Sequence, residues 1–206
     1  MSPFRTVAKV GGSWLAHPQV VEILGGWLEK QPAGPILLFV GGGELVEQLR
    51  TYDHRFSLGE VLSHRLALSL LDVTAELLAT ILKLPLVAWP PRGDWSETTA
   101  ATAVFQPHAW LRFHEEQPTP PWPRTWQTTS DSLAAVLAAE LDADLILLKS
   151  RPAEATNYVN SATREQIQSW AATGFVDPYF PIATQGVRSV RIEVPGSFPL
   201  STTQHA

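Results

Sequence analysis

The 206-residue sequence predicts an α/β domain with a mostly parallel central sheet. Three observations lead to this class. Short apolar runs rich in β-branched residues alternate with longer stretches whose apolar residues recur at helical spacing. Two of the apolar runs end in glycines and lead directly into a helical stretch, as strand-to-helix turns of parallel sheets do. No internal repeat or interdomain linker is visible, so residues 1–206 are predicted to form one domain.

The apolar runs place the expected strands at 6–10, 35–40, 84–89, 143–150 and 189–194. Helical spacing places the expected helices at 14–30, 44–52, 58–83, 130–141 and 161–173. The segment from Pro90 to Trp126 is rich in proline and tryptophan. It is expected to hold one or two strands, near 102–106 and 109–113. The tail, 196–206, is expected to be loose.

Composition and charge narrow the function. Hydrophobic residues make up 45% of the chain and charged residues 17%, which is typical of a globular protein. The net charge of −5 argues against a general binder of nucleic acids or anionic membranes. The chain has no cysteine, which excludes disulfides and thiolate metal sites. The longest apolar stretch, 66–82, is interrupted by Asp72 and Glu76, and no secretory signal is visible. We therefore expect a cytoplasmic protein with neither nucleic-acid nor membrane partners.

The first glycine turn follows the strand at 6–10, where Lys9 precedes Gly11, Gly12 and Ser13. Glycines let backbone N–H groups approach a ligand without a Cβ in the way, and the helix that follows directs its free N–H groups at the same spot. From the strand end, the Lys9 ammonium can reach a phosphoryl oxygen over the turn. The pattern indicates a phosphate site; the alternative is a tight turn whose lysine extends into solvent.

A second turn, Gly41–Gly43, repeats this arrangement after the strand at 35–40. It lacks the third glycine of a dinucleotide fingerprint, which disfavours a nicotinamide-dependent oxidoreductase. Neither turn continues into the Gly-Lys-Ser/Thr of a Walker loop. Ligands collect at the carboxyl ends of parallel strands, so two such turns suggest two anionic groups held side by side. Phosphoryl transfer between two substrates requires that arrangement.

A third segment, TTSDSLAAVLAAELDADLILLKS, places Ser130 and Asp131 at a helix start. Asp131 is either part of a helix cap or a carboxylate that holds the Lys9 ammonium in place. Lys149 and Ser150 end the strand that follows this helix. They are expected to face the same edge of the sheet as the glycine turns.

The histidines show no metal-binding spacing such as His-Glu-x-x-His, so no metal held by protein ligands is expected. His64 lies in the helix at 58–83. It either pairs with Glu60 one turn earlier, the favoured interpretation, or faces the acceptor and binds or deprotonates it. For His17, a role in a turn is favoured, and the alternative is that it helps to bind phosphate. Asp177 precedes a proline, where a turn is expected.

Three segments resemble the amino acid kinase superfamily, which includes acetylglutamate, aspartate, uridylate and isopentenyl phosphate kinases. They are KVGGS at 9–13, LLFVGGGELVEQLR at 37–50 and SDSLAAVLAAELDADLILLKS at 130–150. The TSDS and LLKS sequences, the closing GFVDPYFP and the short length look most like one branch. This branch is that of the aminomethylfuran-methyl phosphate kinase of methanofuran biosynthesis.

The resemblance implies a three-layer αβα sandwich with ATP and acceptor along the carboxyl edge of the sheet. The acceptor side would lie in about residues 1–125 and the nucleotide side in about 126–195. Lys9 would stabilise the transferring phosphoryl group and Asp131 would orient the lysines. The residues then expected to bind phosphate or nucleotide are Gly11, Gly12, Ser13, Ser130, Lys149, Ser150 and Asp177, and those expected to bind the acceptor are Gly41, Gly42, Gly43 and His64. Mg²⁺ would be held by the nucleotide phosphates and water, and the superfamily suggests a homodimer.

The chain departs from the superfamily after the strand at 143–150. Many members have Thr-Asp-Val-Asp-Gly where this chain has Lys149-Ser150-Arg151-Pro152-Ala153, and no lysine follows Lys149 as the usual second catalytic lysine. Arg151, Arg164 and Arg188 are the candidates to replace that lysine, although arginine and lysine differ in geometry. Two hypotheses follow. The leading one is a small-molecule kinase acting on an anionic acceptor, and its rival is a small-anion-binding or regulatory domain without ATP chemistry.

Overall fold

A computed structural model describes residues 2–90, 94–95, 102–150 and 161–196. Six strands form one sheet in the order β3-β4-β2-β1-β5-β6, and every neighbouring pair is parallel. This confirms the predicted α/β class and its parallel sheet. The strands are β1 (Thr6–Val10), β2 (Ile36–Val40), β3 (Leu86–Ala88), β4 (Ala103–Gln106), β5 (Asp144–Leu148) and β6 (Val190–Glu193).

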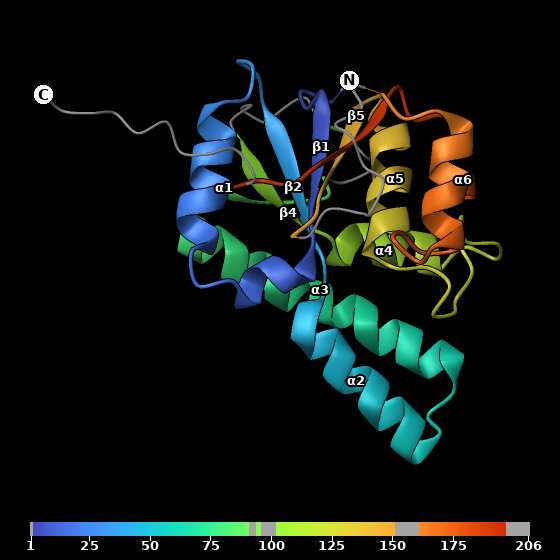
Figure 1. Cartoon of the computed structure of the whole chain (residues 1–206). Helices are drawn as coiled ribbons and strands as arrows, with labels where there is room; N and C mark the ends of the chain where they lie inside the picture. The colour runs from blue at the N-terminus through green and yellow to red at the C-terminus, as the bar shows by residue number, and fades with distance from the viewer. Residues whose placement is uncertain (1, 91–93, 96–101, 151–160, 197–206) are drawn as a thin grey trace, which may run out of the picture.

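Helices cover both faces of the sheet and make it a three-layer sandwich (Figure 1). They are the 3₁₀ helix η1 (Gly12–Ala16) and the α-helices α1 (Val20–Glu29), α2 (Gly43–Phe56), α3 (Glu60–Leu82), α4 (His108–Glu115), α5 (Ser130–Glu140), α6 (Arg164–Ala172) and α7 (Phe180–Ala183). One buried cluster joins one face of the sheet to α1 and α3, and a larger cluster joins the other face to α4, α5, α6 and α7.

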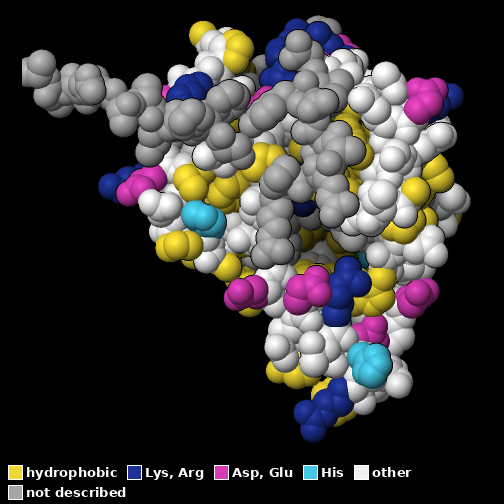
Figure 2. All heavy atoms as spheres, viewed as in Figure 1, with side chains coloured by type: hydrophobic (Ala, Val, Ile, Leu, Met, Phe, Trp, Pro, Cys, Tyr) yellow, Lys and Arg dark blue, Asp and Glu magenta, His cyan; other side chains and the backbone are white. Residues whose placement is uncertain are grey.

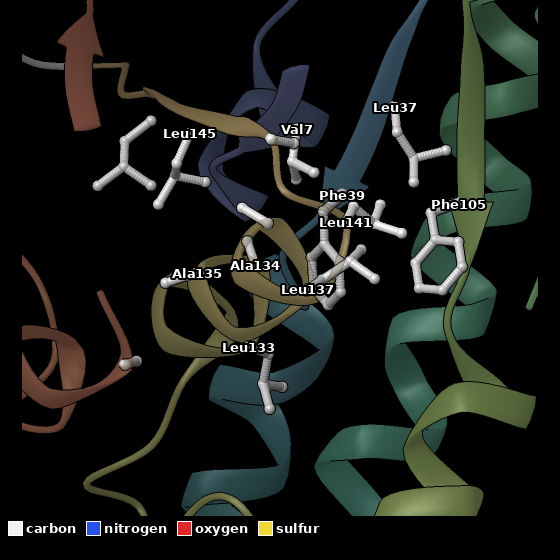
Figure 3. Packing of buried hydrophobic residues seen from close by; sticks show 14 of the residues in the cluster. Val7, Leu37, Phe39, Phe105, Leu133, Ala134, Ala135, Leu137, Leu141 and Leu145 are labelled. Carbon is white, nitrogen blue, oxygen red and sulfur yellow. The ribbon is translucent and has the colours of Figure 1, made fainter. Parts of the chain in front are cut away.

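The central strands are apolar along their whole length because both faces of the sheet are covered. All five residues of β2 are buried. Side chains of a strand point alternately to opposite faces, so Val7 of β1 packs into the larger cluster while Ala8 packs into the smaller one. Figure 3 shows Phe39 of β2 packed beside Leu137 of α5 and Leu141, which follows that helix.

Two predicted elements differ from the structure. The helix predicted at 14–30 is two helices, η1 and α1, because the residue before a proline is disfavoured in the α conformation; His17, before Pro18, is extended (φ −80°, ψ 125°). The strand predicted at 109–113 is wrong: these residues belong to α4, which buries Trp110 and Leu111 on one face. Aromatic residues suit strands, but here they follow Pro107 in a helix in which Trp110 is buried and Phe113 is exposed.

A hairpin formed by α2 and the first turns of α3 stands away from the sandwich, beyond the end of β2, while the rest of α3 packs on the sheet (Figure 1). Its tip turns at Ser57 and Gly59, which have positive φ values of 51° and 86°. Among the described residues, no helix is both long and apolar enough to cross a membrane. The division into an acceptor side and a nucleotide side stays a prediction; β1 of the first part pairs directly with β5 of the second.

Candidate active site

The two glycine turns meet at the carboxyl edge of the sheet. The Gly11 N–H donates to the Leu148 carbonyl at the end of β5 (3.1 Å), and the Gly41 N–H donates to the Val10 carbonyl at the end of β1 (2.9 Å). A Cβ on Gly12 would lie only 2.1 Å from the backbone nitrogen of Gly43. The turns are therefore in backbone contact, which glycine alone allows at this position.

The second turn also borders Lys9 and the start of α5. A Cβ on Gly41 would lie 2.8 Å from the hydroxyl of Ser130 and 3.5 Å from Cε of Lys9. Gly43 opens α2 with a φ of +54°, a conformation that residues with a Cβ rarely adopt. The structure thus brings together both glycine turns, Lys9 and Ser130.

Asp131 lies between two lysines from neighbouring strands. Its Oδ1 is 2.7 Å from Nζ of Lys9, and its Oδ2 accepts a hydrogen bond of 2.7 Å from Nζ of Lys149. Lys149 also donates to the carbonyl of Phe175 at 2.8 Å and lies over that residue's ring. Nearby, the hydroxyls of Ser13 and Ser150 are hydrogen bonded at 2.8 Å. The loop after β5 is thereby joined to the first glycine turn.

The electrostatics of this group keep Asp131 ionised. Burial on its own would raise the pKa of Asp131, but the neighbouring Lys9 and Lys149 ammonium groups outweigh it and lower the pKa to about 2. Burial lowers the pKa of Lys149, against the opposing effect of Asp131. Lys9, Lys149 and Asp131 alone sum to one positive charge at the edge of the sheet where the glycine turns lie, and the Asp177 carboxylate behind them offsets part of it. This charge suits a phosphoryl group.

Asp177 fixes the start of α5. Its carboxylate accepts hydrogen bonds from the backbone N–H and the hydroxyl of both Thr129 and Ser132. Burial raises its pKa, against the hydrogen bonds from Ser132 and Thr129. Thr129 is the N-cap of the helix that carries Asp131. Asp177 thus lies behind the ion pairs as a positioning group, and its predicted nucleotide contact stays a prediction.

A cavity of about 540 Å³ opens between the glycine turns, the α2–α3 hairpin and the start of α5. Figure 2 shows the surface hollowed above the hairpin, with hydrophobic side chains in its walls and charged side chains along the hairpin. Of the predicted site residues, six line this cavity: Gly12, Ser13, Gly42, Gly43, His64 and Ser130. Polar groups therefore line its sheet end, and Leu68, Leu71 and Leu133 supply apolar wall.

His64 is buried in α3, and its favoured pairing with Glu60 is wrong. Its Nε2 lies 3.5 Å from Oε1 of Glu115, at the end of α4, and its side chain is 3% exposed. The pairing with Glu60 fails because this face of α3 is turned to the cavity and the sandwich. His17 accepts a hydrogen bond from the backbone of Gln19 at 3.2 Å, as expected of a turn residue.

Sequence reasoning missed Arg50 and Trp126, which also line the cavity. The Arg50 guanidinium lies 4.0 Å from the centre of the Trp126 ring, and the indole N–H donates to Asp53 at 2.8 Å. Helical spacing held a signal for Arg50, because it lies seven residues after Gly43 and so on the same face of α2. Trp126 belongs to an irregular segment, for which no periodicity applies.

Two of the arginines considered as a second catalytic cation lie at the wrong edge of the sheet. Arg188 contacts Asp142 and Asp144, at the amino end of β5. Arg164 follows Ala162, whose N–H donates to the carbonyl of Val190 at the amino end of β6. Arg151 lies outside the described residues. Lys149, at the carboxyl end, is instead the second ammonium beside Asp131.

The site fits a phosphoryl group held by amides and ammonium groups. Glycine at positions 12 and 41 lets the two turns meet, because a Cβ there would clash with Gly43 or with the Ser130 hydroxyl, and Cε of Lys9 lies close to the second turn. Within the described part of the chain, no three histidines or carboxylates cluster as a metal site would require. Mg²⁺ carried by nucleotide phosphates and water would need no such cluster.

Comparison with known proteins supports this geometry at the level of the fold. The chain aligns with uridylate kinase from Archaeoglobus fulgidus at 13% identity and a TM-score of 0.59, covering 93% of this chain and 91% of that one. It aligns with UMP kinase from Ureaplasma parvum at 13% identity and a TM-score of 0.61, covering 94% and 90%. The chain has the amino acid kinase fold.

A third aligned structure is UMP kinase from Bacillus anthracis, with 11% identity, a TM-score of 0.56 and coverage of 94% and 87%. UMP kinases belong to the amino acid kinase superfamily, which the sequence segments resembled. No protein-family model and no curated protein matches the chain. At such low identity the comparison establishes the fold, and the chemistry must be argued from the site.

Proposed function

We propose that this protein is an ATP-dependent small-molecule kinase. The observation that carries the proposal is the meeting of Lys9, Asp131 and Lys149 with two contacting glycine turns at one edge of the sheet. In the reaction, an acceptor oxygen forms a bond to the γ-phosphorus of ATP while the bond to the β–γ bridging oxygen breaks, and ADP leaves. Such a transfer depends mainly on alignment and charge neutralisation, which this site provides.

The residues divide between donor and acceptor. Lys9 and the amide of Gly12 would stabilise the transferring phosphoryl group, and Asp131 would hold Lys9 and Lys149 in place. The role expected of the Gly11 amide is not proposed, because its N–H already donates to the Leu148 carbonyl. Gly41–Gly43 and the cavity would bind the acceptor. Mg²⁺, held by the nucleotide phosphates, would neutralise charge during the transfer.

The favoured acceptor is a phosphate monoester, which gives a diphosphate; a carboxylate acceptor is the second choice. The aligned structures are UMP kinases, so UMP is the first compound to assay. The methanofuran branch rests on the sequence resemblance alone, and aminomethylfuran-methyl phosphate is the second compound. A homodimer and a cytoplasmic location remain part of the proposal.

The decisive experiment compares wild type with Lys9→Met in an assay that contains ATP, Mg²⁺ and a panel of small phosphates and carboxylates. Removing one group that stabilises transition-state charge should lower kcat about 100- to 1,000-fold. Lys30→Met is the matched control, because Lys30 is exposed at the end of α1 and should keep wild-type turnover. Equal turnover of wild type and Lys9→Met would overturn the assignment.

One observation favours the rival function, a small-anion-binding domain without ATP chemistry. The Lys149 ammonium already has two partners within the protein, Asp131 and the Phe175 carbonyl. Calorimetry separates the two functions. A kinase binds ATP–Mg²⁺ and the acceptor, whereas the rival binds inorganic phosphate and shows no heat with millimolar ATP.

A further inference from the structure

A half-buried carboxylate at the end of α4, that of Glu115, lies beside the histidine in the cavity wall. His64, Leu68 and Leu71 recur at helical spacing on α3, and all three line the cavity. Glu115 approaches His64 from α4, with Oε1 3.5 Å from Nε2. This contact joins the acceptor cavity to a residue that does not line it.

Both oxygens of Glu115 are held in place. The indole N–H of Trp122 donates to Oε1 at 2.6 Å, and Nε of Arg124 donates to Oε2 at 2.7 Å. A second Arg124 nitrogen donates to the backbone carbonyl of Glu115. Burial would raise the pKa of Glu115, but the nearby His64 imidazole and hydrogen bonds from Trp122 and Arg124 outweigh it and lower the pKa to about 2. Glu115 is therefore a fixed negative charge at neutral pH.

The contact is what orients the imidazole. Nε2 of His64 is buried and, in the described part of the chain, no hydrogen bond satisfies it. A buried polar nitrogen is unfavourable without a partner, and the nearby carboxylate supplies an attractive one. A carboxylate can only accept, so it favours the ring orientation and tautomer in which Nε2 carries a proton and faces Glu115.

We propose that Glu115 is a positioning residue that holds the His64 ring where it contacts the acceptor. The inference rests on the proposed function, because it gives the cavity an acceptor. His64 then binds the acceptor directly, while Glu115 acts through His64 without touching the substrate.

A second carboxylate of the same kind provides an internal comparison. Glu140 accepts a hydrogen bond from the Trp110 indole (2.8 Å), and its other oxygen lies 2.8 Å from Nε2 of His114. Neither His114 nor Glu140 lines the cavity. Glu115→Gln and Glu140→Gln therefore each remove a carboxylate charge that lies beside an indole N–H and a histidine. Only Glu115 contacts the histidine that lines the cavity.

The test is steady-state kinetics of the full chain with ATP and the best acceptor from the panel. Glu115→Gln should raise the acceptor KM about tenfold and leave the ATP KM and kcat within twofold of wild type. His64→Gln should do the same, and the double variant should add little to either. Glu140→Gln should leave the acceptor KM unchanged, even if it lowers the melting temperature.

A merely structural Glu115 would lower the melting temperature and leave the acceptor KM unchanged, and that result overturns the proposal. So would independent, multiplying effects of the Glu115 and His64 variants. If Glu115→Gln does not fold, Glu115→Asp keeps the charge and changes its distance; an unchanged acceptor KM there also counts against the proposal.

If wild type phosphorylates no compound, the proposed function fails, and the positioning role is tested separately by calorimetry with inorganic phosphate. Glu115→Gln and His64→Gln should each weaken phosphate binding about tenfold, and Glu140→Gln should not. Equal affinity in wild type and Glu115→Gln would overturn the proposal.

Discussion

At the scale of single residues, the two glycine turns leave no room for a side chain between them. A Cβ on Gly12 would lie 2.1 Å from N and 2.4 Å from Cα of Gly43, so the turns would have to separate to admit it. Gly12→Ala should therefore lower the free energy of unfolding by about 1 to 3 kcal/mol and reduce turnover. Urea unfolding and the kinase assay measure the two effects.

The control for this variant is a glycine with free space. A Cβ on Gly25, within α1, meets nothing within 4 Å. Gly25→Ala should raise the free energy of unfolding by about 0.5 to 1 kcal/mol, because alanine is the better helix former. If both alanine variants had the same effect, the backbone contact would not constrain the site.

The charge of Asp131 makes stability depend on pH. Its pKa falls from 3.8 to about 2 in the folded chain, so its ionisation contributes about 2 kcal/mol of stability above pH 4. That contribution should be lost as the pH falls from 4 to 2. Asp131→Asn leaves Lys9 and Lys149 buried without their counterion and should lower stability at pH 7 by about 3 to 5 kcal/mol.

Urea unfolding of wild type and Asp131→Asn at pH 7, 4 and 2.5 tests this expectation. All other carboxylates titrate in both proteins, so the difference between the two stabilities isolates Asp131. The difference should shrink at pH 2.5. A difference that stays constant with pH would contradict an ionised Asp131 as the source of the stability.

At the scale of elements, the position of the ion pairs depends on where α5 begins. The Asp177 carboxylate holds this start through Thr129 and Ser132. Asp177→Asn replaces one accepting oxygen with a donor and should lower the free energy of unfolding by about 1 to 3 kcal/mol. It should also reduce turnover, because Asp131 lies in the first turn of the same helix.

The matched variant is Asp142→Asn. Asp142 is exposed, and its positive φ of 51° is a conformation that asparagine tolerates. Thermal unfolding and turnover of this variant should match wild type. If Asp177→Asn also matched wild type in both measurements, the positioning role of Asp177 would be refuted.

The elements that the sequence predicted well are those with uniform burial. The strand predicted at 35–40 is the fully buried β2, and the helix predicted at 58–83 is α3. The strand predicted at 109–113 failed because Trp110 and Phe113 have strand propensity, while the burial of Trp110 and Leu111 depends on packing that local sequence does not encode. The local sequence pattern thus identifies a helix or strand correctly where its burial in the folded chain agrees with the secondary-structure propensity of its residues.

Prediction of the site from the sequence has the same limit: local pattern shows single turns, but not which of them the fold brings together. Glycines after strands made both turns visible, because parallel strands end at one edge of the sheet. The family resemblance implied that Asp131 orients the lysines, but the residue pattern alone did not show that Lys149 pairs with it. That pairing depends on β1 and β5 being neighbours, which only the strand order shows. The contact between Glu115 and His64 likewise joins two helices far apart in sequence.

At the scale of the whole molecule, stability is unevenly distributed. Both buried clusters lie in the sandwich, and α3 contributes to them. Within α2, Leu49 is the buried side chain, and the helix meets the segment before α5 through Asp53 and Arg50 at Trp126. A helix with so little buried surface should open locally without global unfolding.

Trp126→Phe removes the indole hydrogen bond to Asp53 and should speed amide hydrogen exchange in α2 about tenfold or more. Exchange in α5 and the melting temperature should change little, because the sandwich keeps its two clusters.

The control variant, Trp27→Phe, loses an indole hydrogen bond of the same kind, to Glu193, within the sandwich. It should lower the melting temperature and leave exchange in α2 at the wild-type rate, since Trp27 lies on α1. Faster exchange in α2 for both variants would mean that hairpin and sandwich unfold as one unit, and then the cavity wall could not adjust to an acceptor independently of the sheet.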